Sequence, residues 1–203
     1  MRKISKIKIP TPEQWLNLAT YKDTYRPNLR HPYCSGDEIV STDGHRMHIV
    51  KLDQPGTKGY IGRAIDNGDT FPDYKHVWPE KFTHSLTSSI GLEEVKKLKA
   101  LLAYGSAFNP SKDMPVFVRL SPTEKDKNLR VLLSLNARCG GGSIVLPIEY
   151  KGEEIGVNLS YLIDAIIPTR QFTWSFSGQD SGMVIEYSNL KYTSLIMPVR
   201  LEW

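Results

Sequence analysis

The chain has 203 residues, of which 40% are hydrophobic and 24% charged, and its formal net charge is +4. This composition is that of an ordinary globular protein, and the length permits one or two domains with a sizeable core. No apolar run approaches the roughly 20 residues that cross a bilayer, and the basic N-terminus lacks the apolar segment of a signal peptide. Two cysteines cannot make a disulfide framework, so we expect a cytoplasmic protein without membrane contact.

The N-terminal part of the chain predicts a short strand followed by a helix. Isoleucines alternate partly with lysines over residues 4–9, which is typical of an exposed strand. Residues 11–23 then have the pattern of a helix. Thr11 is a good N-cap, and Gln14 stands at the spacing of a capping box.

A hairpin and a linker come next. Residues 38–52 predict a β-hairpin, because Asp43 and Gly44 form the pair that supplies positive φ in a tight turn. Residues 67–81 contain prolines, glycine and other turn-forming residues, which favours a linker.

From residue 82 onward the pattern is a lead-in strand, a helix, three strands, a second helix and three strands. It predicts an internal repeat of a helix followed by an antiparallel meander. Runs of strands of this kind favour an α+β fold over a parallel doubly wound sheet. Residues 1–66 look like one more, incomplete copy. We expect helices at residues 91–106 and 157–167, and strands at 114–120, 129–138, 140–150, 172–177, 182–188 and 192–201.

The residues that suggest catalysis or metal binding do not form a convincing site. A metal site could draw on His45 and His48, with His31 and Cys34 nearby, but the spacing matches no zinc pattern. Residues Ser41, Asp43 and His45 include the side-chain types of a catalytic triad. Side chains so close together on one hairpin cannot point at one another as a triad requires.

Two further features have an ordinary and a functional interpretation. Residues 139–143, "CGGGS", superficially resemble a phosphate-binding loop, but they join two predicted strands, so a hairpin turn is favoured. Lys96, Lys97 and Lys99 lie on the polar side of the predicted helix. They form either a solvated face or a surface that contacts phosphates without sequence preference.

Four stretches together resemble the bacterial DNA polymerase III β subunit, the sliding clamp. They are "TDGHR" (42–46), "FPDYKHVWP" (71–79), "NLSYLIDAI" (158–166) and "YTSLIMPVRL" (192–201). Each motif is weak alone, but their order is that of the family, and the last lies near the end of the chain, as it does there. The resemblance covers about residues 10–203.

The resemblance implies a DNA-clamp fold within the α+β class. A β clamp has three domains, each built from two helix-plus-meander modules. Residues 71–203 resemble the complete third domain. Residues 1–70 resemble a second domain shortened to about one module, and the first domain has no counterpart.

The resemblance also implies a groove that binds extended peptides from polymerases, clamp loaders and other replication proteins. In clamps the TDGHR turn forms one wall of this groove and has no catalytic role. Carried over by motif, the peptide-binding residues are Thr42, Gly44, His45, Arg46, Met47, Pro72, His76, Val77, Asn158, Tyr161, Leu195, Ile196, Met197, Pro198, Val199 and Arg200. We expect Met47, Val77, Ile196 and Met197 to form an apolar floor.

In clamps the helices line a central hole and present basic residues to double-stranded DNA. Lys96, Lys97, Lys99 and Lys22 are the corresponding candidates here, and they would contact phosphates without reading sequence.

The leading hypothesis is therefore a shortened sliding clamp, a non-enzymatic processivity factor without a cofactor, acting as a homo-oligomer. A chain of three modules would close a ring of twelve modules with four chains. If the first segment counts as a full domain, three chains would suffice. The alternative is an interaction module, as from a phage or plasmid, that keeps the peptide groove, encircles nothing and competes for clamp-binding partners.

Overall fold

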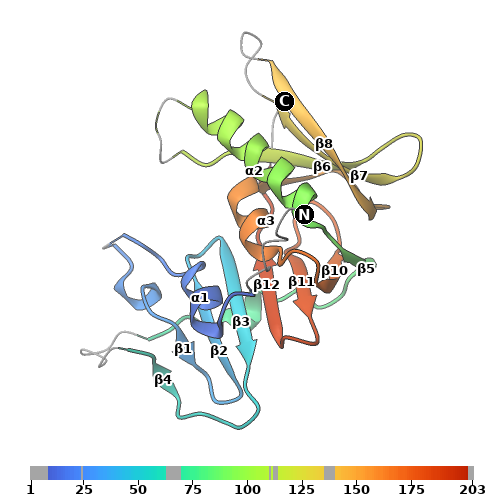
Figure 1. The fold of residues 1–203 in the computed structure, drawn as a ribbon. Coiled ribbons are helices and arrows are strands. Elements are labelled where there is room, and N and C mark those ends of the chain that lie inside the picture. The colour runs from blue at the N-terminus through green and yellow to red at the C-terminus, as the bar shows by residue number, and fades with distance from the viewer. Residues whose placement is uncertain are drawn as a thin grey trace, which may run out of the picture.

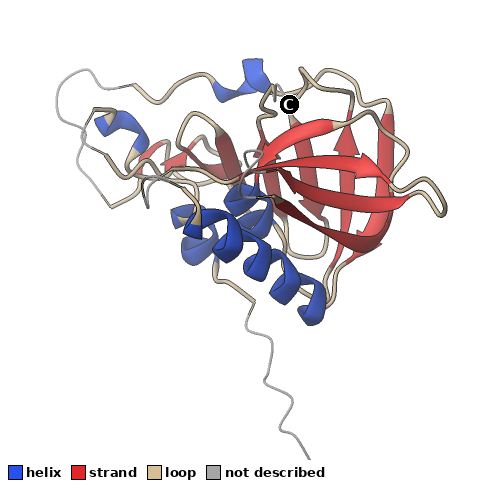
Figure 2. Cartoon of the chain, turned by 90° about the horizontal axis from the view of Figure 1, so that it is seen from above, coloured by secondary structure: helices blue, strands red, loops and turns tan. Residues whose placement is uncertain are grey.

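A computed structural model describes residues 9–23, 25–62, 70–109, 111, 114–134 and 140–200. Over these residues the fold is α+β, as predicted, with two antiparallel sheets and three α-helices that gather on one side of the molecule (Figure 1, Figure 2). The strand expected at residues 4–9 lies outside the described residues except for Ile9. Within these ranges no helix is long and apolar enough to cross a membrane.

Among the described residues, the N-terminal part contains one α-helix, one short 3₁₀ helix and four strands, followed by a linker with a second 3₁₀ helix. These elements are α1 (Pro12–Asn17), the 3₁₀ helix η1 (Pro27–Leu29), β1 (Tyr33–Cys34), β2 (Glu38–Thr42), β3 (Arg46–Lys51), β4 (Gly59–Tyr60) and η2 (Tyr74–Val77). The hairpin predicted at residues 38–52 is confirmed by the pairing of β2 with β3.

The remainder of the chain holds two longer modules. Its elements are β5 (His84–Ser89), α2 (Leu92–Ala107), β6 (Phe117–Pro122), β7 (Asn128–Ser134), β8 (Gly141–Glu149), β9 (Ile155–Asn158), α3 (Leu159–Ala165), β10 (Gln171–Phe176), β11 (Met183–Tyr187) and β12 (Tyr192–Ile196). Strand β9 was not predicted, and it takes the first residues of the expected second helix. Pairing of β7 with β8 confirms the hairpin that was predicted around "CGGGS", although Cys139 itself is not described.

The strand order repeats one plan three times. Each helix is followed by a three-stranded antiparallel meander, and a fourth strand lies beside the first strand of the meander. The orders β4-β1-β2-β3 and β12-β11-β10-β5 join through β3 and β12 into an eight-stranded sheet, while β8-β7-β6-β9 forms the second sheet. At the junction Met47 stands opposite Leu195 in antiparallel register.

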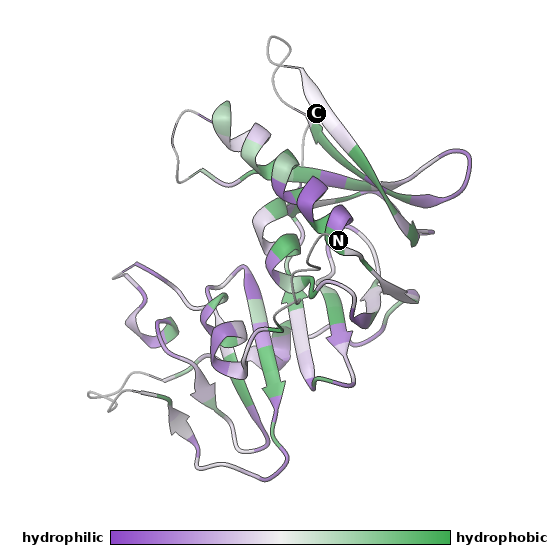
Figure 3. Ribbon diagram, in the orientation of Figure 1, coloured by the Kyte–Doolittle hydropathy of each residue, from purple (hydrophilic) through white to green (hydrophobic). Residues whose placement is uncertain are grey.

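The main core lies between the sheets and the helices. Helix α2 buries Val95, Leu98 and Leu101 on one stripe, as its sequence period predicts. Trp174 and Phe172 of β10 are also buried in this core. Hydrophobic positions run along β3 and the other central strands, where each sheet is covered (Figure 3).

A smaller core lies on the outer face of the eight-stranded sheet. Phe71, Tyr74, Trp78 and Phe82 of the linker pack there against residues from β2, β3, β11 and β12. The linker therefore crosses the β3–β12 junction and is attached to both sides of it.

Helix α1 is shorter than predicted. The predicted capping box is present, because Thr11 Oγ1 accepts from the Gln14 N–H at 3.2 Å and Gln14 Oε1 accepts from the Thr11 N–H at 3.1 Å. The helix ends at Asn17, whose carbonyl accepts from the Thr20 hydroxyl at 3.1 Å. This local bond competes with helix propagation, so the chain leaves the helix early.

His48 anchors α1 to the sheet. Its ring stacks on Trp15 with 4.2 Å between centroids, and its Nδ1 lies 2.7 Å from the Trp15 carbonyl oxygen. The side chain is completely buried. Burial lowers the pKa of His48 from 6.5 to about 3, so the ring is neutral in the folded protein at neutral pH.

We expect this histidine to make the fold sensitive to acid. Below pH 6.5 the unfolded chain binds a proton at His48 that the folded chain excludes, so stability is lost as the pH falls toward about 3. Because of this group, the free energy of unfolding should fall by up to about 1.4 kcal/mol for each unit by which the pH is lowered. Urea unfolding between pH 7 and pH 5 should show it. His48→Phe should flatten the slope, because the buried titrating group is then absent. Equal slopes for wild type and His48→Phe would contradict the assignment.

Candidate functional site

The TDGHR segment is a tight turn held by its own side chains. The Thr42 hydroxyl donates to the Arg46 carbonyl at 2.6 Å and accepts from the Gly44 N–H at 3.0 Å. The Asp43 carboxylate accepts from the backbone N–H groups of His45 and Arg46 at 2.9 and 3.1 Å. Gly44 has a φ of +91°, which explains the glycine at this position. The turn is therefore rigid and leaves the His45 side chain exposed.

The turn is bonded directly to the end of β12. The Met197 N–H donates to the His45 carbonyl at 2.9 Å, and β3 pairs with β12 below this point. Two stretches that are about 150 residues apart in sequence thus form one continuous surface.

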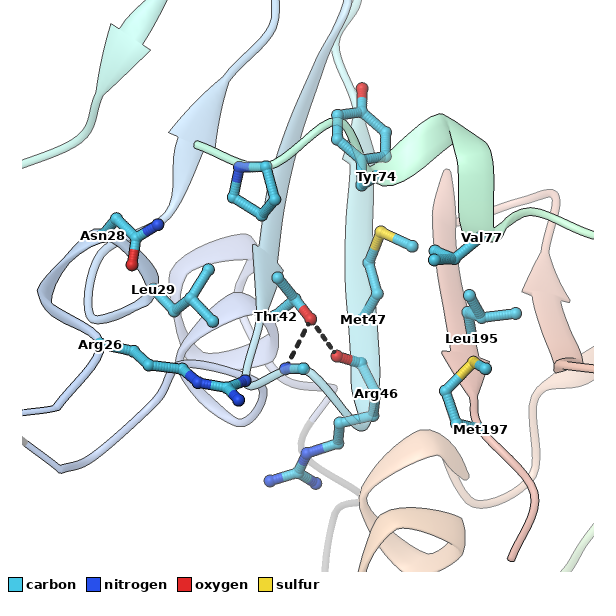
Figure 4. Close-up of a pocket in the computed structure, with 12 residues that line it drawn as sticks. Arg26, Asn28, Leu29, Thr42, Arg46, Met47, Tyr74, Val77, Leu195 and Met197 are labelled. Carbon is cyan, nitrogen blue, oxygen red and sulfur yellow. Dashed lines mark hydrogen bonds between the residues drawn. The ribbon is translucent and has the colours of Figure 1, made fainter. Parts of the chain in front are cut away.

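A first cavity, pocket A, opens beside the turn and has a volume of about 440 Å³. Figure 4 shows Met47, Val77, Leu195 and Met197 converging on it from β3, the linker and the β12 end. Its full lining is Arg26, Asn28, Leu29, Thr42, Gly44, Arg46, Met47, Pro72, Tyr74, Val77, Leu195 and Met197. Apart from the rim, these walls are apolar and suit hydrophobic side chains.

A second cavity, pocket B, lies on the other side of Met197 and has a volume of about 600 Å³. It combines apolar walls with several hydroxyl, amide and imidazole groups. Its lining is His45, Leu102, Ser106, Met114, Pro115, Val116, Phe117, Asn158, Ser160, Tyr161, Met197, Pro198 and Val199. Because Met197 lines both cavities, the two pockets lie next to each other at this side chain, and we refer to the pair as the groove.

Most of the predicted groove residues line one pocket or the other, but three do not. The Ile196 side chain is fully buried in the main core, because successive residues of β12 point to opposite faces and Leu195 faces pocket A. The expectation that Ile196 belongs to the floor is therefore corrected. His76 is 83% exposed and pairs with Asp73, outside both cavities. Arg200 is also exposed and pairs with Asp180.

Asn158 lines pocket B but its amide oxygen is already used. It caps α3, as predicted, by accepting from the N–H and hydroxyl of Ser160 at 3.0 and 2.8 Å. Only 6% of the residue is exposed. Asn158 therefore shapes the pocket wall at least as much as it offers a polar contact.

Arg46 lies at the boundary of the pockets, and its guanidinium is engaged within the protein. It bonds Asp43 at 3.1 Å and Asp164 of α3 at 2.5 Å, and it donates to the Leu18 carbonyl at the end of α1. It also lies 4.3 Å from the centre of the Tyr161 ring. In Figure 4 the guanidinium points away from the pocket methionines. Arg46 thus fixes the turn, α1 and α3 together.

Several lining residues had no signal in the sequence. Arg26, Asn28 and Leu29 come from a turn-rich loop whose pattern indicated only irregular structure. The Arg26 guanidinium lies over the turn, 2.6 Å from the place where a Cβ on Gly44 would stand. This contact puts a positive charge at the rim of pocket A.

The α2 lysines are partly balanced by neighbouring carboxylates. Lys96 bonds Glu93 at 2.7 Å, and this hydrogen bond lowers the pKa of Glu93. Lys97 lies 4.0 Å from Glu94. Lys99 lines a small cavity between the three helices, and Lys22 is exposed near the end of α1. The side of the molecule that carries the helices is therefore less basic than the lysines alone suggest.

The residues that suggested a catalytic triad are not brought together. The Ser41 hydroxyl is buried and donates to the Leu16 carbonyl at 2.6 Å, so it does not donate to His45 as the serine of a triad would. Over the described ranges no group of three or more His, Cys, Asp or Glu side chains is placed to hold a metal ion. The two pockets offer a ligand apolar walls in pocket A and both apolar and polar groups in pocket B.

A search of solved structures finds sliding clamps. The β sliding clamp of Caulobacter crescentus matches with a TM-score of 0.71 at 18% identity, over 92% of this chain and 62% of that chain. The Pseudomonas aeruginosa clamp, solved with a ligand, matches with a TM-score of 0.69 at 20% identity, over 92% of this chain and 64% of that chain. The Borrelia burgdorferi β subunit, in complex with a natural product, matches with a TM-score of 0.70 at 20% identity, over 92% of this chain and 60% of that chain.

No protein-family model matches this sequence, and no curated protein matches it. The chain spans about 60% of the length of the solved structures it resembles. It therefore has the fold of the DNA polymerase III β sliding clamps in a shortened form, as the motifs predicted.

We expect Arg46 to contribute strongly to stability. Arg46→Met removes the charged hydrogen bonds of Asp43 and the Leu18 carbonyl, so it should destabilise the fold by about 2–3 kcal/mol in urea unfolding. Arg200→Met is the matched control, because Arg200 and Asp180 are 82% and 73% exposed. It should change stability by less than about 0.5 kcal/mol. Equal losses in the two variants would show that Arg46 has no special structural role.

Proposed function

We propose that this protein is a clamp-like, non-enzymatic factor of DNA replication that captures extended peptides of polymerase and clamp-loader type. The observation that carries the proposal is the groove, the pair of neighbouring pockets A and B that share Met197. The shortened clamp fold supports it, and residues of the motifs that resemble the clamp family line both pockets.

The chemistry of the groove suits a peptide with apolar anchors and a polar segment. Pocket A has apolar walls that include Met47, Leu195 and Met197. Methionine side chains are flexible and can adapt to different side chains of a ligand. His45 and Tyr161 give pocket B polar groups beside an apolar wall. A peptide that places hydrophobic residues in pocket A and a polar residue in pocket B uses both environments.

The proposal includes non-specific contact with double-stranded DNA through the side that carries the helices. Lys96, Lys97 and Lys99 of α2 and Lys22 after α1 would meet phosphates there. Glu93 and Glu94 reduce this attraction, so we expect weak binding by one chain and useful binding only in an oligomer that surrounds the duplex.

A second candidate function is favoured by the carboxylates that pair with the α2 lysines. A module whose helices attract DNA only weakly can keep the groove without encircling a duplex. Such a module would compete for the peptides that clamps bind. Light scattering separates the two: a closed oligomer of stable mass supports a ring, and a smaller species supports the competing module.

A labelled peptide of the polymerase clamp-binding type should bind the protein in fluorescence anisotropy. Met197→Asp and His45→Asp should each weaken binding at least tenfold, or about 1.4 kcal/mol. At position 197 a carboxylate would lie against the apolar anchors of the peptide, and at position 45 it would replace the imidazole at the polar end of the groove. The matched control is His76→Asp, which is exposed outside both pockets and should bind normally. Undiminished binding by Met197→Asp, with the fold intact by circular dichroism, would refute the groove.

Binding to a DNA duplex should be tested separately from peptide binding. Replacing Lys96, Lys97 and Lys99 together by Gln should weaken it and reduce its dependence on salt, by about 0.9 in the log–log slope for each lost phosphate contact. Glu93→Gln should strengthen it, since Lys96 would be released. Lys151→Gln, on the loop after β8, is the control and should have little effect. No change in any variant would exclude α2 from DNA contact.

A further inference from the structure

The methionines of this chain differ sharply in exposure. Four of the five lie within the described residues. Met47 and Met183 are buried, with 2% and 0% of the residue exposed. Met114 is 47% exposed, and Met197 is half-buried. A small oxidant in solution can therefore reach Met114 and Met197, whereas the fold shields the other two.

Both accessible methionines line the groove. Met114 is part of the wall of pocket B, which Leu102 and Phe117 also line. Met197 lines pocket A as well as pocket B, and Figure 4 shows its side chain beside Leu195. Among the described methionines, the accessible sulfur atoms thus belong to the proposed peptide site.

Met197 is held in place at the boundary of the two pockets. Its backbone N–H donates to the His45 carbonyl at 2.9 Å. Its side chain packs against the smaller core on the outer face of the sheet. The sulfur lies 3.7 Å from where a Cβ on Gly182 would stand, directly before β11. A chemical change at this sulfur therefore acts on the groove itself.

We propose that oxidation of Met197 to methionine sulfoxide switches off peptide capture, an inference that rests on the proposed function. The sulfur donates a lone pair to one oxygen of hydrogen peroxide, and the O–O bond breaks. The other oxygen leaves as water with both protons, so the sulfur is oxidised by two electrons and the peroxide is reduced. Methionine sulfoxide reductases reverse the change, which makes Met197 a reversible modification site.

The sulfoxide weakens binding because of what surrounds it. It turns a flexible apolar side chain into a polar one, whose oxygen needs a hydrogen-bond donor once a peptide covers it. Val77 and Leu195, on the walls of pocket A, offer no side-chain donor, so covering this oxygen costs binding free energy. Oxidation of Met114 has a smaller effect, because it changes pocket B alone, where hydroxyl and imidazole groups can donate.

Mass spectrometry tests which methionines react. The folded protein is treated with hydrogen peroxide and then with dithiothreitol, which reduces disulfides and sulfenic acids of cysteine and leaves methionine sulfoxide. Proteolytic peptides should carry the sulfoxide at Met114 and Met197 well before Met47 and Met183. Equal rates at all four positions, with the fold intact by circular dichroism, would overturn the selectivity.

Fluorescence anisotropy with the labelled clamp-binding peptide tests the effect on the groove. Wild-type affinity should fall at least about tenfold in step with the sulfoxide at Met197, and methionine sulfoxide reductase should restore it. Each variant is compared with its own unoxidised form. Met114→Leu should lose as much affinity as the wild type. Met197→Leu should lose less than about twofold, because no sulfur remains at position 197.

The remaining outcomes separate this inference from the proposed function. Wild-type binding that survives complete oxidation of Met197, or an equal loss in Met197→Leu, would overturn the switch and leave the groove as a peptide site. A loss of affinity that follows Met114 instead of Met197 would overturn it too. No binding before oxidation would refute the proposed function, and the switch with it.

Discussion

The antiparallel pairing of β3 with β12 is the interaction on which the rest of the structure depends. It joins the N-terminal module to the last module and builds the eight-stranded sheet. The linker is fixed across it by the smaller core on the outer face. Pocket A takes walls from both strands, and Met197 then continues the surface into pocket B. Any change that opens this junction therefore removes the groove as well.

Features that depend on neighbouring residues could be predicted from the sequence. The capping box at Thr11, the hairpin turn at Gly44, the stripe of α2 and the cap at Asn158 all follow from local spacing, and all are present. The early end of α1 could not be predicted in this way. It depends on the Thr20 hydroxyl and on Arg46, which reaches the Leu18 carbonyl from the hairpin.

Most residues that the motifs predict for the groove line pockets A and B, and those that do not are displaced for physical reasons. The motif assigns Ile196 to the groove, but the alternation of side chains along a strand turns Ile196 to the face opposite Leu195 and into the main core. The engagement of Arg46 with Asp164 joins residues 118 positions apart, which no local pattern indicates. Arg26 and Leu29 reach pocket A only because their loop folds back over the turn.

If the proposed peptide occupies the groove, the position of the groove at a junction would link peptide binding to the lifetime of the chain. A ligand that contacts both sides of the junction binds only when the junction is closed, so it shifts the equilibrium away from partly opened forms. Partly opened forms are the ones that proteases cleave. A cell that holds plenty of the partner would then retain more of this protein, and a cell without the partner would clear it faster.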